Sequence, residues 1–389
     1  MVMMTKYAIN TITENPFAPS GAQGYYFHVI NEMKKHLNSD EILYVFCSKA
    51  NYHVFEKTFS ENIKPVVFPF SNEKQILRVI SEHFIFPRKI SELGIDIYNC
   101  GNLAPFYVPK DCSVVSTIKT MHAFTNPSSM SKLKQYYREI LGKRTVKRAS
   151  LIISNSQSNT QDILEYFPVK KNKIRLVYEA LDHSIFKPTL DKSVNHDFLK
   201  KHKIVKPFIL FVSSLYKYKN AETLISAYSK LESRINYQLV IVGFPREQDY
   251  YLKLLSNVKE LGLTENIIFT GGVPLEDTAK FYQSAEVFVY PSKYETFGLT
   301  ILESMACGCP VITSNVSSMP EIGGEAAIYI DPIDEYELSQ KLNQILESVE
   351  KRNSLIEAGI KRADLFDWNV TAKNTLDVYR EAFNTKEQK

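Results

Sequence analysis

The segment Pro291–Pro310 reads PSKYETFGLTILESMACGCP and holds two glutamates, Glu295 and Glu303, around a Phe-Gly-Leu turn. Upstream, AEVFVYPS has the β-branched and aromatic residues of a short strand that ends at a proline. Downstream, TILESMA is a run of good helix formers that stops at Gly308, before the apolar strand PVIT. The segment therefore predicts a strand, a loop, a helix that starts near Gly298, and a second strand.

The start of this predicted helix is suited to an anion. Its first backbone N–H groups lack partners within the helix, and the helix dipole is positive at that end. A carboxylate beside an anion would repel it, so we expect Glu295 and Glu303 to accept hydrogen bonds from hydroxyl groups. A nucleotide sugar offers both hydroxyl and phosphate groups. Two glutamates at this spacing also occur by chance on amphipathic surface helices, so the spacing alone does not distinguish a binding site from a solvent-exposed helix.

Length and composition indicate an ordinary globular protein. The 389 residues suffice for about two domains, and 44% hydrophobic with 23% charged residues is typical of soluble chains. No apolar run approaches the roughly 18 residues of a membrane span, and the first residues lack a signal-peptide pattern. Five cysteines without a framework favour reduced thiols in the cytoplasm. Cys307 and Cys309 lack nearby zinc ligands, so we expect core thiols there.

Short apolar runs alternate with helical stretches along both halves of the chain. In the first half the expected strands are YAINTI, ILYVFC, DIYNC, VVSTI, LIISN and IRLVY, with helices at 24–37 and 128–149 and an N-cap at Ser156. In the second half they are FILFVS, QLVIVG, IIFTGG, EVFVY and PVIT. This pattern predicts an α/β fold with two doubly wound, Rossmann-like domains, 1–190 and 200–365.

The Pro291–Pro310 segment closely resembles the signature of the retaining glycosyltransferases of family 4. In that family a Glu, Phe-Gly-Leu, a second Glu, small residues and Cys-Gly-x-Pro-Val follow one another. The resemblance covers essentially the whole chain and implies the GT-B fold, in which two Rossmann-like domains face each other across a cleft. The tail from about 368 to 384 resembles the family's last helix, which returns to complete the first domain. The polar stretch 184–206 is then a linker and hinge candidate.

The resemblance implies transfer of a hexose from a nucleoside-diphosphate sugar to an acceptor hydroxyl with retained configuration. Glu303 would bind the ribose diol and Glu295 a hydroxyl of the donor sugar. Lys219 would neutralise the leaving diphosphate as a point charge, in the segment YKYKNAE that resembles the family's basic pair. Many relatives have an arginine at or before Tyr218, and Lys217 is the candidate to replace it. The donor would carry GDP or UDP, with GDP-mannose expected from family habit.

Further donor-binding positions are backbone sites. The amides of Phe297, Gly298 and Leu299 would face the diphosphate, and Gly243 and Val273 follow strands whose ends approach the nucleotide. In PFAPSGAQGYYFHVINEM the family's Gly-rich loop is altered, and we prefer Gly24, which opens a helix, over Gly21.

His122 follows the strand VVSTI in TIKTMHAF, which resembles the family's Thr-x-His element near the transferred sugar. Beyond the carboxyl end of a strand, such a side chain is expected to face the cleft and to hydrogen-bond a sugar hydroxyl. A lone histidine is more often structural. No Asp-x-Asp motif lies in a suitable loop, so we expect no metal and no other cofactor.

A basic stretch, Lys132–Arg148, interleaves lysines and arginines with aromatic and aliphatic residues. A helix of this kind is suited to peripheral contact with the anionic inner face of a membrane, and equally to being a solvated helix with one core face. The acceptor is expected to be a glycan or lipid-linked glycan in surface polysaccharide synthesis. No nucleic-acid motif accompanies the charge. The alternatives are a nucleotide-sugar epimerase, a phosphorylase, or a non-catalytic scaffold with the same fold.

Overall fold

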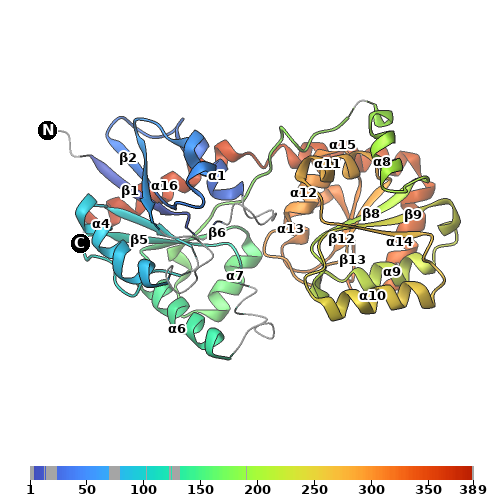
Figure 1. Cartoon of the computed structure of the whole chain (residues 1–389), viewed down its shortest axis with the longest axis horizontal. Coiled ribbons are helices and arrows are strands. Elements are labelled where there is room, and N and C mark those ends of the chain that lie inside the picture. Colours follow the sequence, from blue (N-terminus) through green and yellow to red (C-terminus); the bar gives the residue numbers. More distant parts are fainter. Residues whose placement is uncertain are drawn as a thin grey trace. The chain divides into compact units, whose positions relative to one another are not determined.

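The computed structural model describes residues 4–12, 14, 24–69, 79–101, 103–121, 124, 132–189 and 191–387. The chain forms two compact units. Unit 1 runs to Glu179 and takes in the segment from Trp368 onward, and unit 2 is Ala180–Asp367. The first unit therefore ends before the predicted boundary at 190. In each unit a parallel sheet is covered by helices on both faces (Figure 1).

The strands of unit 1 form one parallel sheet in the order β3-β2-β1-β4-β5-β6-β7. They are β1 (Thr5–Asn10), β2 (Glu41–Ser48), β3 (Ile63–Phe68), β4 (Ile97–Cys100), β5 (Ser113–Ile118), β6 (Leu151–Ser154) and β7 (Ile174–Leu176). Strand β3 was not predicted from the sequence, because it carries Pro65, which lies opposite Val45 of β2. Proline cannot donate to the ladder, and β3 lies at the sheet edge, where that loss is tolerated.

Helices surround this sheet. They are α1 (Gly24–Met33), α2 (Tyr52–Phe55), α4 (Phe86–Leu93), α6 (Lys132–Arg148), α7 (Gln157–Tyr166) and α16 (Trp368–Glu387), with short turns η1 (Glu56–Thr58), η2 (Ser81–Ile85) and η4 (Lys171–Lys173). The expected cap of α7 is confirmed, because the Ser156 hydroxyl accepts from the Asn159 N–H at 2.9 Å. Of the helix predicted at 128–149, residues 128–131 lie outside the described residues.

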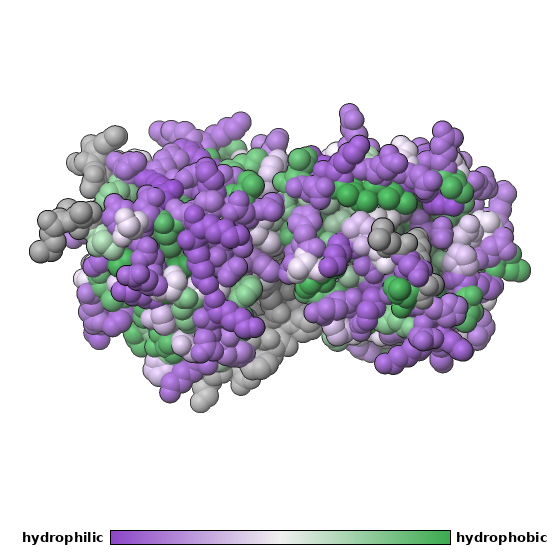
Figure 2. Space-filling model, turned by 90° about the horizontal axis from the view of Figure 1, so that it is seen from above, coloured by the Kyte–Doolittle hydropathy of each residue, from purple (hydrophilic) through white to green (hydrophobic). Residues whose placement is uncertain are grey.

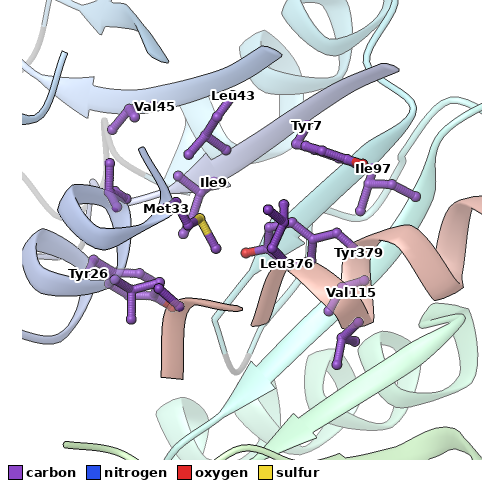
Figure 3. Close-up of a cluster of buried hydrophobic side chains, with 14 of the residues drawn as sticks. Tyr7, Ile9, Tyr26, Met33, Leu43, Val45, Ile97, Val115, Leu376 and Tyr379 are labelled. Carbon is purple, nitrogen blue, oxygen red and sulfur yellow. The ribbon is translucent and has the colours of Figure 1, made fainter. Parts of the chain in front are cut away.

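The core of unit 1 joins both ends of the chain. Figure 3 shows Tyr7 and Ile9 of β1 beside Leu43 and Val45 of β2, with Tyr26 and Met33 from α1 and Leu376 and Tyr379 from α16 around them. Ala8 and Phe46 alternate with these residues and face the other side, where they pack with Phe86 of α4. The last helix is therefore part of the first unit's core.

The sheet of unit 2 has the order β10-β9-β8-β11-β12-β13. Its strands are β8 (Phe208–Val212), β9 (Gln238–Val242), β10 (Ile267–Gly271), β11 (Val287–Tyr290), β12 (Val311–Ser314) and β13 (Ala327–Ile330). Strand β13 was not predicted from the sequence; its four residues AIYI follow a glycine-rich turn. The chain leaves β8 toward β9 on one side and returns to β11 on the other. This change of direction is a topological switch point, where open α/β sheets bind ligands outside the strand carboxyl ends.

Helices α9, α10 and α14 lie on one side of this sheet, and α11, α12 and α15 on the other (Figure 1). The bounds are α8 (His196–Lys201), α9 (Ala221–Ser229), α10 (Gln248–Glu260), α11 (Leu275–Ser284), α12 (Leu299–Ala306), α13 (Met319–Gly323), α14 (Glu335–Glu347) and α15 (Val349–Ala363). Short turns are η5 (Lys192–Asn195), η6 (Lys217–Lys219), η7 (Arg234–Asn236) and η8 (Gly324–Ala326).

The surface is mostly polar on the face shown in Figure 2, where hydrophobic residues form scattered patches between hydrophilic ones. Among the described residues, no helix combines the length and apolar character needed to cross a bilayer. Large apolar side chains are nevertheless exposed on α6, where Leu133 is 79% and Tyr136 64% exposed.

Candidate functional site

Lys219 and Glu295 meet at the switch point of unit 2. Lys219 ends the turn η6 after β8, and Glu295 lies in the loop after β11, the strand that pairs with β8. The Lys219 Nζ atom lies 2.6 Å from Glu295 Oε1, and the two side chains are only 13% and 12% exposed. Two residues far apart in the sequence thus form a nearly buried ion pair at the edge where a ligand is expected.

Two further hydroxyls converge on the same carboxylate oxygen. Tyr290 donates to Glu295 Oε1 at 2.6 Å and Ser292 at 2.8 Å, while the Lys219 ammonium also donates to the Tyr290 hydroxyl at 2.8 Å. Within the described residues, Glu295 Oε2 receives no hydrogen bond. Burial alone would lower the pKa of Lys219. The neighbouring Glu295 carboxylate, with Tyr290 and Tyr218, has the larger effect and raises that pKa above its usual value. The lysine is therefore charged, and one carboxylate oxygen remains to accept from a ligand.

The two loops are held by buried polar contacts. Asn220, directly after Lys219, has a left-handed backbone with φ of 64°. Its side-chain amide donates to the carbonyls of Pro291 at 2.9 Å and Pro332 at 2.7 Å, which ties the β8 loop to the β11 loop. The Glu295 backbone is fixed in turn by Ser317, whose hydroxyl accepts from the Glu295 N–H and lies 2.6 Å from its carbonyl. These hydrogen bonds fix the backbone on both sides of the ion pair, so the Lys219 and Glu295 side chains start from well-defined positions.

The start of α12 follows the loop that carries Glu295. Gly298 is its N-cap, with φ of 95°, and no side chain of the described residues caps this end. Leu299 is the first helical residue, and the Thr300 hydroxyl is enclosed without a hydrogen-bond partner among the described residues. Phe297 is 4% exposed and packs edge-on against Phe366, so its side chain belongs to the core and only its backbone is available.

Glu303 lies one turn further along α12. Its side chain is 6% exposed, and its Oε2 atom accepts a hydrogen bond from the Tyr282 hydroxyl at 3.2 Å. Burial raises its pKa from 4.5 to about 7, although the bond from Tyr282 acts in the opposite direction. This carboxyl therefore changes its charge near neutral pH, which is unusual for glutamate.

The predicted glycine positions have local structural reasons. Gly243 directly follows β9 with φ of 147°, and a Cβ atom there would lie 1.8 Å from the Ser213 carbonyl oxygen. A Cβ atom on Gly272 would lie 2.0 Å from the ring of Phe244. Val273 follows in the loop after β10 and is partly exposed. The group that lies close to Gly243 is thus the Ser213 carbonyl of the chain's own backbone. This reason for a glycine could not be seen in the sequence.

The remaining predicted residues are placed elsewhere or not described. Gly24 opens α1 in unit 1, as expected. His122 and Gly21 lie outside the described residues. Lys217 is exposed in a hollow lined by Lys217, Glu247, Gln248, Asp249, Tyr250 and Lys253, and its backbone N–H donates to Glu247.

Four of the partners that build the site were not predicted from the sequence: Tyr290, Ser292, Tyr282 and Thr300. Tyr290 and Ser292 flank the proline that ends the strand. Two hydroxyl side chains this close to Glu295 were the sequence feature from which these partners could have been predicted. The described residues contain no cluster of three or more His, Cys, Asp or Glu suited to a metal. All five cysteines are free and buried.

Comparison with protein families gives two matches that together cover most of the chain. Residues 23–185 match the model described as Glycosyltransferase Family 4, and residues 195–362 match Glycosyl transferases group 1. The O-antigen chain mannosyltransferase B of Escherichia coli is 30% identical over 71% of this chain and 72% of that protein. The MMP alpha-(1->4)-mannosyltransferase of Mycolicibacterium hassiacum is 28% identical, over 62% of this chain and 56% of its own length.

Solved structures share the fold. A sucrose-phosphate synthase from Thermosynechococcus elongatus matches with a TM-score of 0.76 at 19% identity, over 98% of this chain and 100% of that one. The Anabaena protein HepE, in complex with UDP-glucose, matches with a TM-score of 0.70 at 18% identity, over 99% and 100%. The expected architecture of two Rossmann-like units is confirmed by these matches and by the two parallel sheets.

Proposed function

The chain belongs to the GT-B glycosyltransferases, with a family 4 domain in its first half and a group 1 domain in its second, and we propose that it transfers a hexose from a nucleoside-diphosphate sugar to a glycan hydroxyl. Mannose is the first choice for the hexose, since relatives such as the E. coli O-antigen enzyme are mannosyltransferases by name. The observation that carries the proposal is the Lys219–Glu295 pair at the switch point, beside the start of α12.

The donor diphosphate is proposed to sit at the N-terminus of α12, on the amides around Gly298 and Leu299. Helix N-termini favour anions, and this one has no side-chain cap among the described residues. Lys219 adds a positive charge that counters the charge developing on the leaving diphosphate. The enclosed Thr300 hydroxyl is a further donor at the same helix start.

Glu295 is proposed to orient the donor sugar. Its Oε1 atom is fully engaged by Lys219, Tyr290 and Ser292, so the contact to a sugar hydroxyl falls to Oε2. The diphosphate then competes with Glu295 for the lysine, which couples donor binding to the position of the glutamate. Glu303, deeper on the same helix, is proposed to accept hydrogen bonds from the ribose diol in its ionised form.

The finer features of the reaction belong to the same proposal. Retention of configuration and independence of divalent metal follow the family resemblance, and His122 is proposed to contact the transferred sugar. Gly24, Gly243 and Val273 are proposed to line the donor. The acceptor is a surface glycan or its lipid-linked precursor, and α6 is proposed to lie against an anionic membrane through its exposed Leu133 and Tyr136.

The test is nucleotide-sugar binding followed by product analysis. We expect GDP-mannose or UDP-glucose to stabilise the full chain in a thermal-shift titration containing EDTA, and NMR of the transfer product to show the donor's anomeric configuration. Absence of stabilisation by either nucleotide sugar, in a folded sample, would contradict the donor assignment. Stabilisation only with added divalent metal would contradict metal independence.

A further inference from the structure

Large apolar side chains of unit 1 lie exposed on three neighbouring segments. Phe84 on η2 is 67% exposed, and Phe106 and Tyr107, in the loop between β4 and β5, are 47% and 59% exposed. The third segment is α6, with its exposed Leu133 and Tyr136. We call Phe106 and Tyr107 the aromatic loop. Exposed aromatic side chains that gather in this way mark a surface that binds a partner.

The aromatic loop is held in place by contacts on both sides. His83 of η2 stacks on the Phe106 ring with the ring centres 4.1 Å apart, and its Nδ1 atom accepts from the Phe106 N–H at 2.9 Å. The His83 Nε2 atom lies 3.0 Å from the Tyr137 hydroxyl of α6, and the Arg144 guanidinium of the same helix donates to the Phe106 carbonyl at 2.8 Å. These contacts join the three segments and fix the backbone of Phe106, so the exposure of its ring is a built feature of unit 1.

Two hollows flank the aromatic loop, and both are lined by cations. One, of about 450 Å³, lies toward α4 and has Arg88 in its lining. The other, of about 470 Å³, lies toward α6 and is lined by Arg144, Lys147 and Arg148. The aromatic loop contributes to the lining of both hollows, and no Asp or Glu of the described residues lines either of them. Both hollows therefore attract an anion.

The arginines of the second hollow are held by backbone carbonyls. Arg148 donates from one terminal nitrogen to the carbonyls of Pro109 at 3.2 Å and Cys112 at 2.9 Å, and Arg144 donates to that of Phe106. A guanidinium has five N–H donors, so each arginine keeps donors that the described residues do not engage. Phosphate, with several oxygen atoms, is a preferred partner of such a group.

The combination of rings and cations selects one occupant. Free phosphate would use the cations and gain nothing from the exposed rings, and an uncharged apolar peptide would use the rings and leave the cations without partners. An anionic phospholipid layer supplies both groups, because its phosphates lie beside the acyl chains. Aromatic side chains favour this boundary, and basic side chains are drawn to the anionic head groups.

We propose that the aromatic loop and its two hollows insert into the surface of an anionic bilayer, with Tyr107 and Phe84 at the level of the acyl chains and lipid phosphates in the hollows. The inference rests on the membrane contact proposed for α6 and deepens it. It adds a second surface at the end of α6 opposite to Leu133 and names the lipid group that this surface binds.

Insertion is tested with Tyr107→Trp in the full chain and phosphatidylglycerol vesicles whose acyl chains carry bromine, which quenches nearby tryptophan. We expect the fluorescence of this variant to fall by roughly half on binding. Tyr336→Trp, at an exposed tyrosine of α14 in unit 2, is the matched control and should change little. The wild type, with Trp368 as its single tryptophan, gives the background. Equal quenching of the two bound variants would overturn the inference.

The role of the hollows is tested with Arg88→Gln and Lys147→Gln together, which removes one exposed cation from each hollow. We expect the dissociation constant for phosphatidylglycerol vesicles, measured by co-sedimentation, to rise roughly tenfold. Lys57→Gln with Lys64→Gln, on exposed lysines of η1 and β3, is the control with the same change in net charge and should lose much less. An equal loss in both pairs would mean that only net charge matters, against the inference.

The outcomes separate this inference from the proposals on which it builds. If Leu133→Ser with Tyr136→Ser abolishes vesicle binding while Tyr107→Trp stays unquenched in the bound chain, the α6 contact stands and the inference is wrong. It is also wrong if inorganic phosphate releases the chain from vesicles more than chloride does at the same ionic strength, or if the wild type binds no anionic vesicles. Nucleotide-sugar affinity without vesicles should be unchanged in all these variants, so a wild type that binds no nucleotide sugar refutes the transferase proposal alone.

Discussion

At the scale of single residues, the Lys219–Glu295 pair makes a prediction about stability as well as binding. Lys219→Met leaves a nearly buried carboxylate without its counter-charge, so we expect a loss of about 3 kcal/mol in the free energy of unfolding. Adding Glu295→Gln should recover most of that loss, because the uncompensated charge disappears. Denaturant titration of the two single variants and the double variant measures the coupling.

Nucleotide-sugar affinity separates the roles of this pair. All three variants should bind the donor at least tenfold more weakly, including the restabilised double variant, since both groups are proposed to contact the donor. Lys259→Met, on an exposed lysine of α10 in the same unit, is the control and should bind normally. Strictly additive stability changes for the two substitutions would show that the pair contributes nothing as a pair.

Glu303 makes a prediction about pH. Its pKa is about 7 in the folded chain and 4.5 when exposed, so the folded chain holds this proton more tightly. The stabilisation is complete below about pH 4.5 and is lost as pH rises through 7, when the buried carboxyl ionises. Glu303→Gln should therefore match the wild type near pH 4.5 and exceed its stability by up to about 3 kcal/mol at pH 8. A difference that is constant from pH 4.5 to 8 would rule out the raised pKa.

The sequence pointed to the charged residues of the candidate site, but not to the hydroxyl groups that contact them. Lys219, Glu295 and Glu303 stand in a recognisable pattern, whereas Tyr290 and Ser292 look like the end of an ordinary strand. Their convergence on one oxygen depends on the pairing of β8 with β11, which a local pattern does not contain. Gly243 was predicted to allow a ligand to approach the backbone closely. In the structure the Ser213 carbonyl lies beside it, which by itself requires a glycine at this position.

At the scale of elements, α6 makes a prediction about membranes. Leu133, Tyr136 and Ile140 are exposed on a helix that also carries Lys143 and Lys147. We expect the full chain to bind vesicles containing anionic lipid in a salt-sensitive manner, and Leu133→Ser with Tyr136→Ser to weaken that binding several-fold. Co-sedimentation with vesicles measures the fraction of the protein that is bound at each salt concentration.

The control for this experiment is Leu252→Ser, on an apolar residue that is 54% exposed on α10 of unit 2. It should leave vesicle binding unchanged. Equal loss in both variants would mean that the effect is not local to α6, and vesicle binding that ignores salt and lipid charge would contradict an electrostatic contact.

Strands with a continuous apolar run were predictable from the sequence, including those of only four residues, whereas the two strands with an interrupted or half-buried run were not. The buried strands β8, β9 and β11 are continuous apolar runs, as expected under helices on both faces. Strand β3 escaped because Pro65 argues against a strand, and only its place at the sheet edge makes it possible. Strand β13 escaped because AIYI directly follows the glycine-rich turn at Gly323 and Gly324 and is buried only at its ends, unlike the fully buried β11.

At the scale of the whole molecule, the two units differ in how they depend on the chain. Unit 2 is one continuous segment, whereas unit 1 needs α16 from the far end. Ala372, Leu376 and Tyr379 are buried in its core. Arg380 on the same helix makes a two-pronged contact with Glu41 of β2, at 2.8 Å for each oxygen. This connection was predicted by the resemblance of the tail, but the ion pair that secures it depends on tertiary contacts.

Removing residues 368–389 should therefore unfold unit 1 and leave unit 2 intact. The deletion exposes the apolar surfaces of α1 and of β4, β5 and β6 that α16 covers, and it leaves the nearly buried Glu41 without Arg380. We expect the combined cost to exceed the roughly 5–15 kcal/mol by which a typical domain is stable. Circular dichroism and amide NMR should show about half of the structure lost, with nucleotide-sugar binding to unit 2 weakened but detectable. Removing only residues 388–389 is the control, and it should change neither the content of secondary structure nor nucleotide-sugar binding. If the chain without residues 368–389 unfolds completely, unit 2 also relies on α16.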